Sequence, residues 1–180
     1  MHFRSPLLAV LSLFLLVGFC QASVGPTCTE MKEDLSDKPD IVLKKFETHV
    51  CEKGCKFTAH GGAFRKKVMH PAISQALKEM GMSSHESAAL HVADDVAKRV
   101  RKECLAKKGD ICQDHETFAE FGKCAKANVW PVVDGKLSEL MPLVSEPSCK
   151  KEKRYLEKPH LYEEVLPRWL DRYAATCKKH

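Results

Sequence analysis

Residues 83–104, SSHESAALHVADDVAKRVRKEC, decide the fold class of this chain. The segment opens with Ser83 and Glu86 at the spacing of a capping box, in which a hydroxyl and a carboxylate satisfy the first N–H groups of a helix. Acidic residues come first and basic residues last on its polar face, as the helix dipole favours. Its apolar residues recur at intervals of three and four, which places them on one helix face: Ala88, Ala89, Val92, Val96, Val100 and Cys104. We expect this to be the longest helix.

Shorter segments on both sides have the same helical spacing. Pro71 and Gly81 have the positions typical of a helix start and a helix end, and Pro131 is expected to interrupt a later helix. No segment alternates apolar and polar residues over the length of a strand, so we expect an all-α fold. The predicted helical segments are residues 39–50, 71–80, 112–124, 150–157 and 161–177, with a short amphipathic turn at 137–141.

The first 22 residues have the composition of a secretory signal peptide. Arg4 supplies a positive charge, residues 7–19 are almost entirely apolar, and Cys20-Gln21-Ala22 fits a cleavage site. The apolar run is shorter than the ~20 residues that span a bilayer. We therefore expect residues 1–22 to be removed and residues 23–180 to form a single secreted domain, with no transmembrane segment. An uncleaved N-terminal anchor is the alternative.

Cleavage after Ala22 also makes the cysteine count even. The full chain has nine cysteines, and loss of Cys20 leaves eight, as a fully oxidised framework requires. Counting alone does not determine how they pair. We expect all eight to form disulfides: Cys28, Cys51, Cys55, Cys104, Cys112, Cys124, Cys149 and Cys177.

The chain is long enough to bury a core, and 44% of its residues are hydrophobic, an ordinary proportion for a globular protein. Disulfides therefore add to a core and do not replace it. We expect an all-α, single-domain, disulfide-stapled helical bundle of five to seven helices. Its oligomeric state does not follow from the sequence.

Motifs for catalysis or metal binding are absent from the sequence. It has no G-x-S-x-G nucleophile elbow and no H-E-x-x-H zinc motif. Cys51 and Cys55 stand one helical turn apart, but disulfides are the preferred interpretation in a secreted chain. His85 and His91 are six residues apart, which does not match a helical zinc site, and we expect His91 to be partly buried. We therefore expect no enzyme activity, cofactor or metal.

Basic residues gather at positions 65–67, 98–102 and 150–154, and the full chain has a net charge of +5. One basic face could bind heparin-like polymers, anionic lipids or nucleic acid. Nearby acidic residues instead favour solvated helix surfaces. We therefore expect no nucleic-acid partner.

The order of the first six of the eight cysteines, with Cys51-x3-Cys55 and the segment from Val100 through Cys104 and Cys112 to Cys124, resembles the insect odorant- and pheromone-binding proteins, which are helical carriers. The likeness covers residues 28–128. The chain departs from the family in a longer gap between Cys112 and Cys124, a longer stretch from Cys55 to Cys104, and an added tail.

This resemblance implies an interlocked disulfide pairing. It would join Cys28 to Cys55, Cys51 to Cys112 and Cys104 to Cys124. The two cysteines of the tail would then pair with each other, as Cys149–Cys177.

Two functions follow as hypotheses. In the first, the protein carries a small apolar ligand in its interior. In the second, it is a secreted interaction protein, such as an effector, venom component or host-directed factor, that binds a host or extracellular protein through its surface. The candidate ligand-lining residues, which could equally form a filled core, are Phe46, Met69, Leu77, Met80, Val92, Val96, Phe118 and Phe121.

The final predicted helix has an apolar face with Trp169, Leu170, Tyr173 and Cys177. Burial of a tryptophan removes a large apolar area from water. We therefore expect this helix to pack onto the bundle.

Overall fold

The computed structural model describes residues 26–28, 30, 38–58, 62–106, 109–140, 143 and 145–180. The predicted signal peptide at residues 1–22 lies outside this part. Within it, the regular segments are helical, and an antiparallel bridge between Cys55 and Lys179 is the β-type pairing. The predicted disulfide-stapled, all-α class is confirmed.

The described chain contains seven α-helices, four π-helical turns and one 3-10 turn. The π turns η1 (Glu47–Cys51) and η4 (Arg101–Leu105) continue α3 and α5, whereas η2 (Arg65–Met69) and η6 (Leu161–Val165) lead into α4 and α9. The 3-10 turn η3 (Ser83–His85) precedes α5. The α-helices are α3 (Lys38–Phe46), α4 (His70–Glu79), α5 (Glu86–Val100), α6 (His115–Asp134), α7 (Leu137–Leu140), α8 (Glu146–Leu156) and α9 (Leu166–Ala174).

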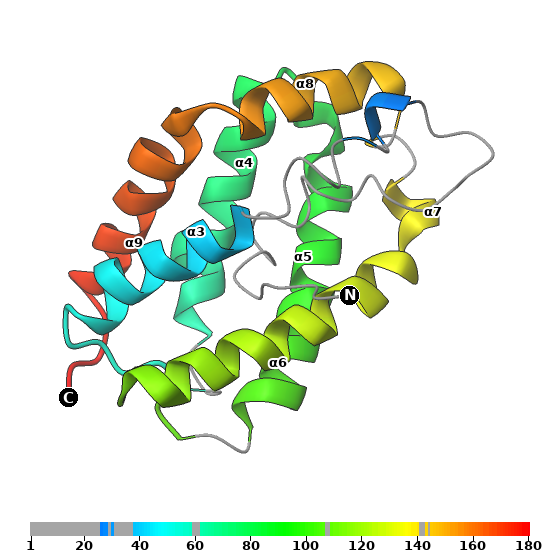
Figure 1. The fold of residues 1–180 in the computed structure, drawn as a ribbon. Coiled ribbons are helices and arrows are strands. Elements are labelled where there is room, and N and C mark those ends of the chain that lie inside the picture. The colour runs from blue at the N-terminus through cyan, green and yellow to red at the C-terminus, as the bar shows by residue number, and fades with distance from the viewer. Residues whose placement is uncertain are drawn as a thin grey trace.

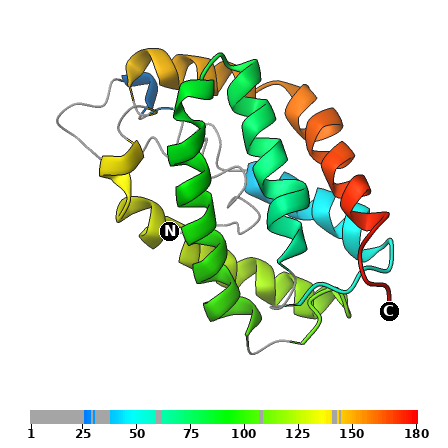
Figure 2. The same ribbon diagram turned by 180° about the vertical axis from the view of Figure 1, so that it is seen from behind.

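Helices α4 and α5 lie side by side and are joined by a short turn (Figures 1 and 2). Helix α6 packs along α5 and η4, and α9 packs against α3, α4 and the π turns η1, η2 and η6. Helix α8 crosses the end of the bundle at which α4 gives way to α5, far from the C-terminus (Figure 1). The helices therefore surround one interior.

The turn between α4 and α5 confirms the role expected for Gly81. Its φ is +68°, in the left-handed region. The Gly81 N–H donates to the Lys78 carbonyl at 3.0 Å, and the Met82 N–H donates to the Leu77 carbonyl at 2.8 Å. These two bonds form a Schellman motif, and Met82 and Leu77 are both buried as that motif favours. The motif directs the chain from α4 back into α5.

Two prolines follow π turns at equivalent places. Pro71 is the second residue of α4, which directly follows η2, and Pro167 is the second residue of α9, which directly follows η6. Proline has no N–H, and its ring crowds the carbonyl four residues earlier. A widened turn gives that carbonyl room, so the helical path begins before each proline and runs through it.

The capping box expected at Ser83 and Glu86 is not formed. Ser83 begins the 3-10 turn, and neither this turn nor α5 has a side-chain cap at its N-terminus. The Glu86 carboxylate instead accepts a hydrogen bond from the Ser74 hydroxyl on α4 at 2.5 Å. Glu86 therefore bonds to a residue of another helix and not to the start of its own helix. This bond between α4 and α5 still stabilises the turn that joins them.

Helix α6, with 20 residues against 15 in α5, is the longest described α-helix, and Pro131 does not interrupt it. Val129 and Val133, on either side of the proline, are buried, and their packing maintains the helix across the missing hydrogen bond. The helix begins after Cys112, which lies in the preceding turn. Asp114 caps it by accepting a hydrogen bond from the Thr117 N–H at 2.7 Å.

All eight predicted cysteines form disulfides. The pairs Cys51–Cys112 and Cys104–Cys124 agree with the pairing implied by the resemblance. The other two expected pairs, Cys28–Cys55 and Cys149–Cys177, are wrong. The observed pairs are Cys28–Cys149 and Cys55–Cys177.

Position explains the difference. Cys28 lies beside α8, where the Thr27 hydroxyl and N–H both donate to the Glu146 carboxylate. Cys55 lies beside the C-terminus, because the Lys56 N–H donates to the Lys178 carbonyl at 2.8 Å. The two cysteines therefore lie at opposite ends of the molecule.

The final helix packs onto the bundle as predicted. Leu170 and Tyr173 on α9 are buried, and α9 contacts α3 and α4. Trp169 is only partly buried: its indole N–H donates to Gln75 Oε1 at 3.0 Å, and the Arg172 guanidinium lies 4.7 Å from its ring. The helix ends at Ala174, before Cys177.

Candidate functional site

The eight predicted lining residues all belong to one buried core, and none of them is more than 8% exposed. The structure therefore brings together residues that the sequence places far apart. Whether they contact a ligand stays a prediction. They come from α3 (Phe46), η2 (Met69), α4 and its last turn (Leu77 and Met80), α5 (Val92 and Val96) and α6 (Phe118 and Phe121).

Phe46, Phe57, Phe64, Phe118 and Tyr173 form a cluster of rings near the C-terminus, here called the aromatic end. The ring centroid of Phe46 lies 5.0 Å from that of Phe57, 5.4 Å from Phe64 and 5.8 Å from Phe118. Tyr173 adds an edge-to-face contact with Phe64 at 5.3 Å. Such pairs stabilise a core beyond the area they bury. The ring centroid of Phe121 lies 6.3 Å from that of Phe118, so three predicted lining residues, Phe46, Phe118 and Phe121, contact other rings of the protein.

The opposite end of the bundle is covered by α8 and is here called the α8 end. The buried face of α8 consists of Cys149, Glu152, Tyr155 and Leu156. Glu152 is 1% exposed, although it is a carboxylic acid. Neither of its carboxyl oxygens has a hydrogen-bond partner within the described chain. Burial raises the pKa of this carboxyl well above its ordinary value.

Glu79, at the end of α4, is a carboxylate that does have hydrogen-bond partners, and its pKa shifts in the opposite direction. The Tyr155 hydroxyl donates to Glu79 Oε2 at 2.7 Å, and the Gln75 amide donates to Oε1, also at 2.7 Å. Burial acts to raise the pKa of Glu79, but these hydrogen bonds and the charge of His160 outweigh it and lower the pKa. Glu152, three residues before Tyr155, has no such partners among the described residues.

Helix α8 is attached to the chain segment around Cys28. The Cys28–Cys149 disulfide joins the two covalently. Two ion pairs of α8 also stabilise its outer side: Lys150 lies 3.3 Å from Glu146, and Lys153 lies 3.5 Å from Glu30. Basic side chains on either side of Glu152 in sequence are thus engaged by other carboxylates.

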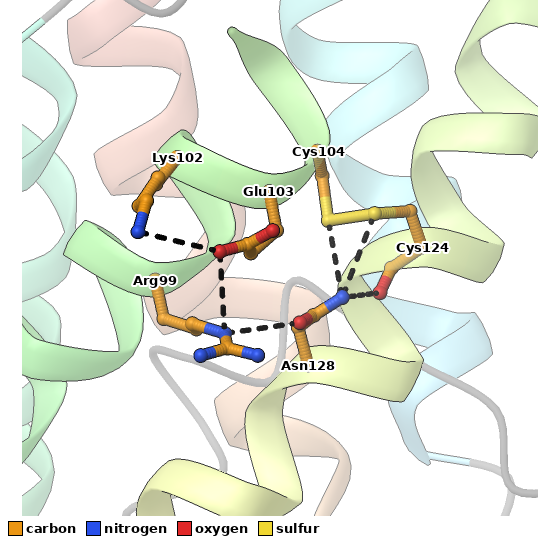
Figure 3. A network of polar contacts seen from close by, with 6 residues as sticks. All are labelled: Arg99, Lys102, Glu103, Cys104, Cys124 and Asn128. Carbon is orange, nitrogen blue, oxygen red and sulfur yellow. Dashed lines mark hydrogen bonds and ion pairs between the residues drawn. A yellow bond between two sulfur atoms is a disulfide. The ribbon is translucent and has the colours of Figure 1, made fainter.

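Two residues of the basic cluster at 98–102, Arg99 and Lys102, belong to a network around a disulfide (Figure 3). The Asn128 amide donates to the Cys124 carbonyl at 3.0 Å and lies 3.7 Å from each sulfur of Cys104–Cys124. The Arg99 guanidinium donates to Asn128 Oδ1 at 3.1 Å. Glu103 lies 3.9 Å from both Arg99 and Lys102. Part of this basic cluster therefore stabilises the junction of η4 with α6.

The basic cluster at 65–67 is also partly engaged. Arg65 lies 3.3 Å from the carboxylate of Asp94, and the Lys67 ammonium donates to the Thr176 hydroxyl at 2.8 Å. The ion pair with Asp94 reduces the positive potential that the cluster presents to a partner.

The side chain of His91 is 59% exposed and pairs with Glu139 at 2.8 Å, so the expectation that it is partly buried is wrong. It lies on the polar side of α5. In the described ranges, no three His, Cys, Asp or Glu side chains are grouped so as to hold a metal ion. No helix there has both the length and the hydropathy needed to cross a bilayer.

Sequence reasoning missed Glu152, because the run from Lys150 to Arg154 has the composition of a solvated surface. The available signal was spacing: Cys149, Glu152 and Leu156 stand at intervals of three and four, so they share one helix face. A cysteine and a leucine on that face indicated that it is the buried one. Phe57, Phe64 and Tyr173 were likewise absent from the predicted lining set.

Comparison with known proteins does not indicate a function for this arrangement. No family model matches the chain, and neither a curated protein nor a solved structure is significantly similar to it.

Proposed function

We propose that the protein is a secreted, non-enzymatic carrier that binds a small apolar ligand in the interior surrounded by the eight predicted lining residues. The observation that supports this most is the arrangement of the disulfides. Each joins segments at least 20 positions apart, and together they connect the elements around one core. Disulfides stabilise the frame without depending on complete internal packing, which lets the interior accommodate a ligand.

The composition of the interior also suits a ligand. Met69, Met80 and Met82 are buried along α4 and its turn into α5. Methionine has a flexible, polarisable side chain that adapts to irregular shapes. Met80 and Met82 lie in the turn that α8 crosses, so we place the adaptable part of the interior at the α8 end.

Disulfides also support secretion, because they persist in oxidising compartments and are rare in the cytosol. The test is to express the full-length chain in a secreting eukaryotic cell and sequence the N-terminus of the protein in the medium. We expect it to begin at Ser23. Retention of residues 1–22, or failure to reach the medium, would refute the secretion part of the proposal.

Ligand binding is tested with diphenylhexatriene, a neutral fluorescent hydrocarbon, titrated into the purified, oxidised protein. We expect saturable fluorescence with one probe per chain and displacement by octanol. Absence of saturable binding ends the carrier proposal.

Two phenylalanine substitutions on α5 locate the binding. Val92→Phe adds bulk inside the core, and Ser87→Phe adds the same side chain on the exposed surface of the helix. We expect at least about a tenfold loss of probe affinity in Val92→Phe and none in Ser87→Phe, with circular dichroism showing that both fold. Because overpacking can unfold a core, Val92→Leu serves as a milder second variant. Equal affinities in all variants would place the probe outside the interior.

The alternative is a surface-binding interaction protein. It would rely on the basic clusters, but Arg65, Arg99 and Lys102 already have acidic neighbours within 3.9 Å. This pairing favours the carrier. If the protein does not bind the probe, the surface-binding function becomes the better hypothesis.

A further inference from the structure

Glu152 is a buried acid whose carboxyl oxygens have no hydrogen-bond partner among the described residues. It is 1% exposed, and its neighbours on the inner face of α8 are a disulfide, Tyr155 and Leu156. A buried polar group that lacks hydrogen bonds destabilises a fold, and an unpaired charge does so far more. Buried polar groups in native proteins are nearly always satisfied. The position therefore calls for a partner that the described chain does not supply.

The protein's own groups near α8 are directed elsewhere. The Tyr155 hydroxyl donates to Glu79, and the Lys150 and Lys153 ammonium groups approach Glu146 and Glu30. The only identified influence on the pKa of Glu152 is burial, which raises it. No charged side chain of the described chain thus compensates the carboxyl group.

We propose that Glu152 recognises the head group of the carried ligand, and that this ligand has an apolar body and a protonated amine. The inference rests on the proposed carrier function and specifies the ligand class. An ammonium group supplies a positive charge and several N–H donors, which together satisfy both oxygens of a carboxylate. A single carboxylate does not provide the oxygen ligands that Mg²⁺ or Ca²⁺ requires.

We place the apolar body of the ligand at the end of α4, which a hydrogen bond joins to α8. Helix α8 crosses the bundle where α4 turns into α5 (Figures 1 and 2), and the Tyr155–Glu79 hydrogen bond links α8 to the end of α4. Leu77 and Met80, in the last turns of α4, are both buried there. An alkyl or aryl group held by its amine at Glu152 would lie against these two side chains.

The experiment compares octylamine with octanol by titration calorimetry on the oxidised protein at neutral pH. The two probes share a chain length and differ in the head group. We expect octylamine to bind about tenfold to a hundredfold more tightly, the range of a charge-assisted hydrogen bond. In Glu152→Gln the two affinities should become equal, with octanol unchanged.

A matched control and a second variant make the result decisive. Glu157→Gln changes an exposed carboxylate at the end of the same helix and should retain the amine preference. Glu152→Leu, which introduces no buried amide, should lose that preference, as Glu152→Gln does. Thermal melts establish that each variant is folded.

The outcomes separate the two proposals. Equal affinities for both probes in the unaltered protein, or an amine preference that survives in Glu152→Gln, would overturn the role of Glu152 and leave the carrier proposal standing. If neither probe binds, both proposals fall.

Discussion

The two ends of the bundle differ in how well their buried side chains are matched. At the aromatic end, Phe46, Phe57 and Phe64 contact one another at centroid distances of 5.0–5.4 Å. At the α8 end, Glu152 is equally inaccessible and has no hydrogen-bond partner among the described residues. The buried rings of the aromatic end contact one another, whereas the buried carboxyl group of the α8 end has no hydrogen-bond partner among the described residues.

The covalent frame follows the same division. Cys51–Cys112 and Cys55–Cys177 lie at the aromatic end, where the His180 N–H also donates to the Gly54 carbonyl at 3.1 Å. At the α8 end, Cys28–Cys149 is the disulfide that holds α8. We therefore expect the aromatic end to be the more rigid one, and the proposed carrier function would place adaptation to a ligand at the α8 end.

The largest expected effect is at the aromatic end. Phe46→Ala removes the ring that contacts three others and should lower the free energy of unfolding by about 3–5 kcal/mol. Chemical denaturation measures this, with Phe46→Leu as a control that keeps an apolar side chain and costs less. A loss below about 1 kcal/mol would mean that the cluster is loosely packed and that the contrast between the ends is false.

The next effect concerns the disulfide at the α8 end. Replacing Cys28 and Cys149 together by serine should lower the free energy of unfolding by about 2–4 kcal/mol. Because α8 then loses its covalent attachment, its amides should exchange with solvent faster than those of α5. Replacing Cys104 and Cys124 instead should leave exchange in α8 unchanged. Protection of α8 as in the parent protein would show that this end is as rigid as the other.

The helical class could be predicted from sequence, because apolar spacing of three and four is a local property. Predictions failed where a distant group decides the outcome. Glu86 bonds to Ser74 and not to its own helix start, and the buried Val129 and Val133 maintain α6 through Pro131. These partners are far from the residues that carry the local signal.

The candidate site follows the same rule. All eight predicted lining residues are buried, because they lie on apolar helix faces. Glu152 was not predicted, because a glutamate in a basic run normally faces water. Only its spacing from Cys149 and Leu156 indicated a buried position. The partner of Cys149 could not be derived either, since counting does not determine pairing.

A smaller effect, of opposite sign, is expected at Glu152. Glu152→Leu removes an unsatisfied buried group and should raise the free energy of unfolding by about 1–3 kcal/mol at neutral pH. Glu157→Leu, on the exposed side, should change it by no more than about 0.5 kcal/mol. A destabilised Glu152→Leu variant would show that the carboxyl group is already satisfied in the free protein.

The same residue predicts a pH dependence. Because burial raises the pKa of Glu152 above the ordinary glutamate value of 4.5, the folded state retains a proton that the unfolded state releases. Its contribution to stability is fully present below about pH 4.5 and is lost as the pH rises towards the folded-state pKa. The slope is up to about 1.4 kcal/mol per pH unit. Denaturation midpoints across this range should show that slope in the parent protein and not in Glu152→Leu.

The smallest effect concerns an exposed ion pair on the surface of the aromatic end, formed by residues close to Phe46 and Phe118 in the sequence. His115 Nδ1 lies 2.7 Å from Glu47 Oε1, and this hydrogen bond and the charge of Glu47 raise the pKa of His115 above 6.5. The pair therefore contributes stability below the unfolded-state pKa and loses it as the pH rises through the folded-state value. NMR titration should give a raised His115 pKa that falls in Glu47→Gln, whereas Glu116→Gln should leave it unchanged. A His115 pKa that does not respond to Glu47→Gln would show that this surface contact is not maintained in solution, and the matched groups of the aromatic end would then be limited to its buried rings.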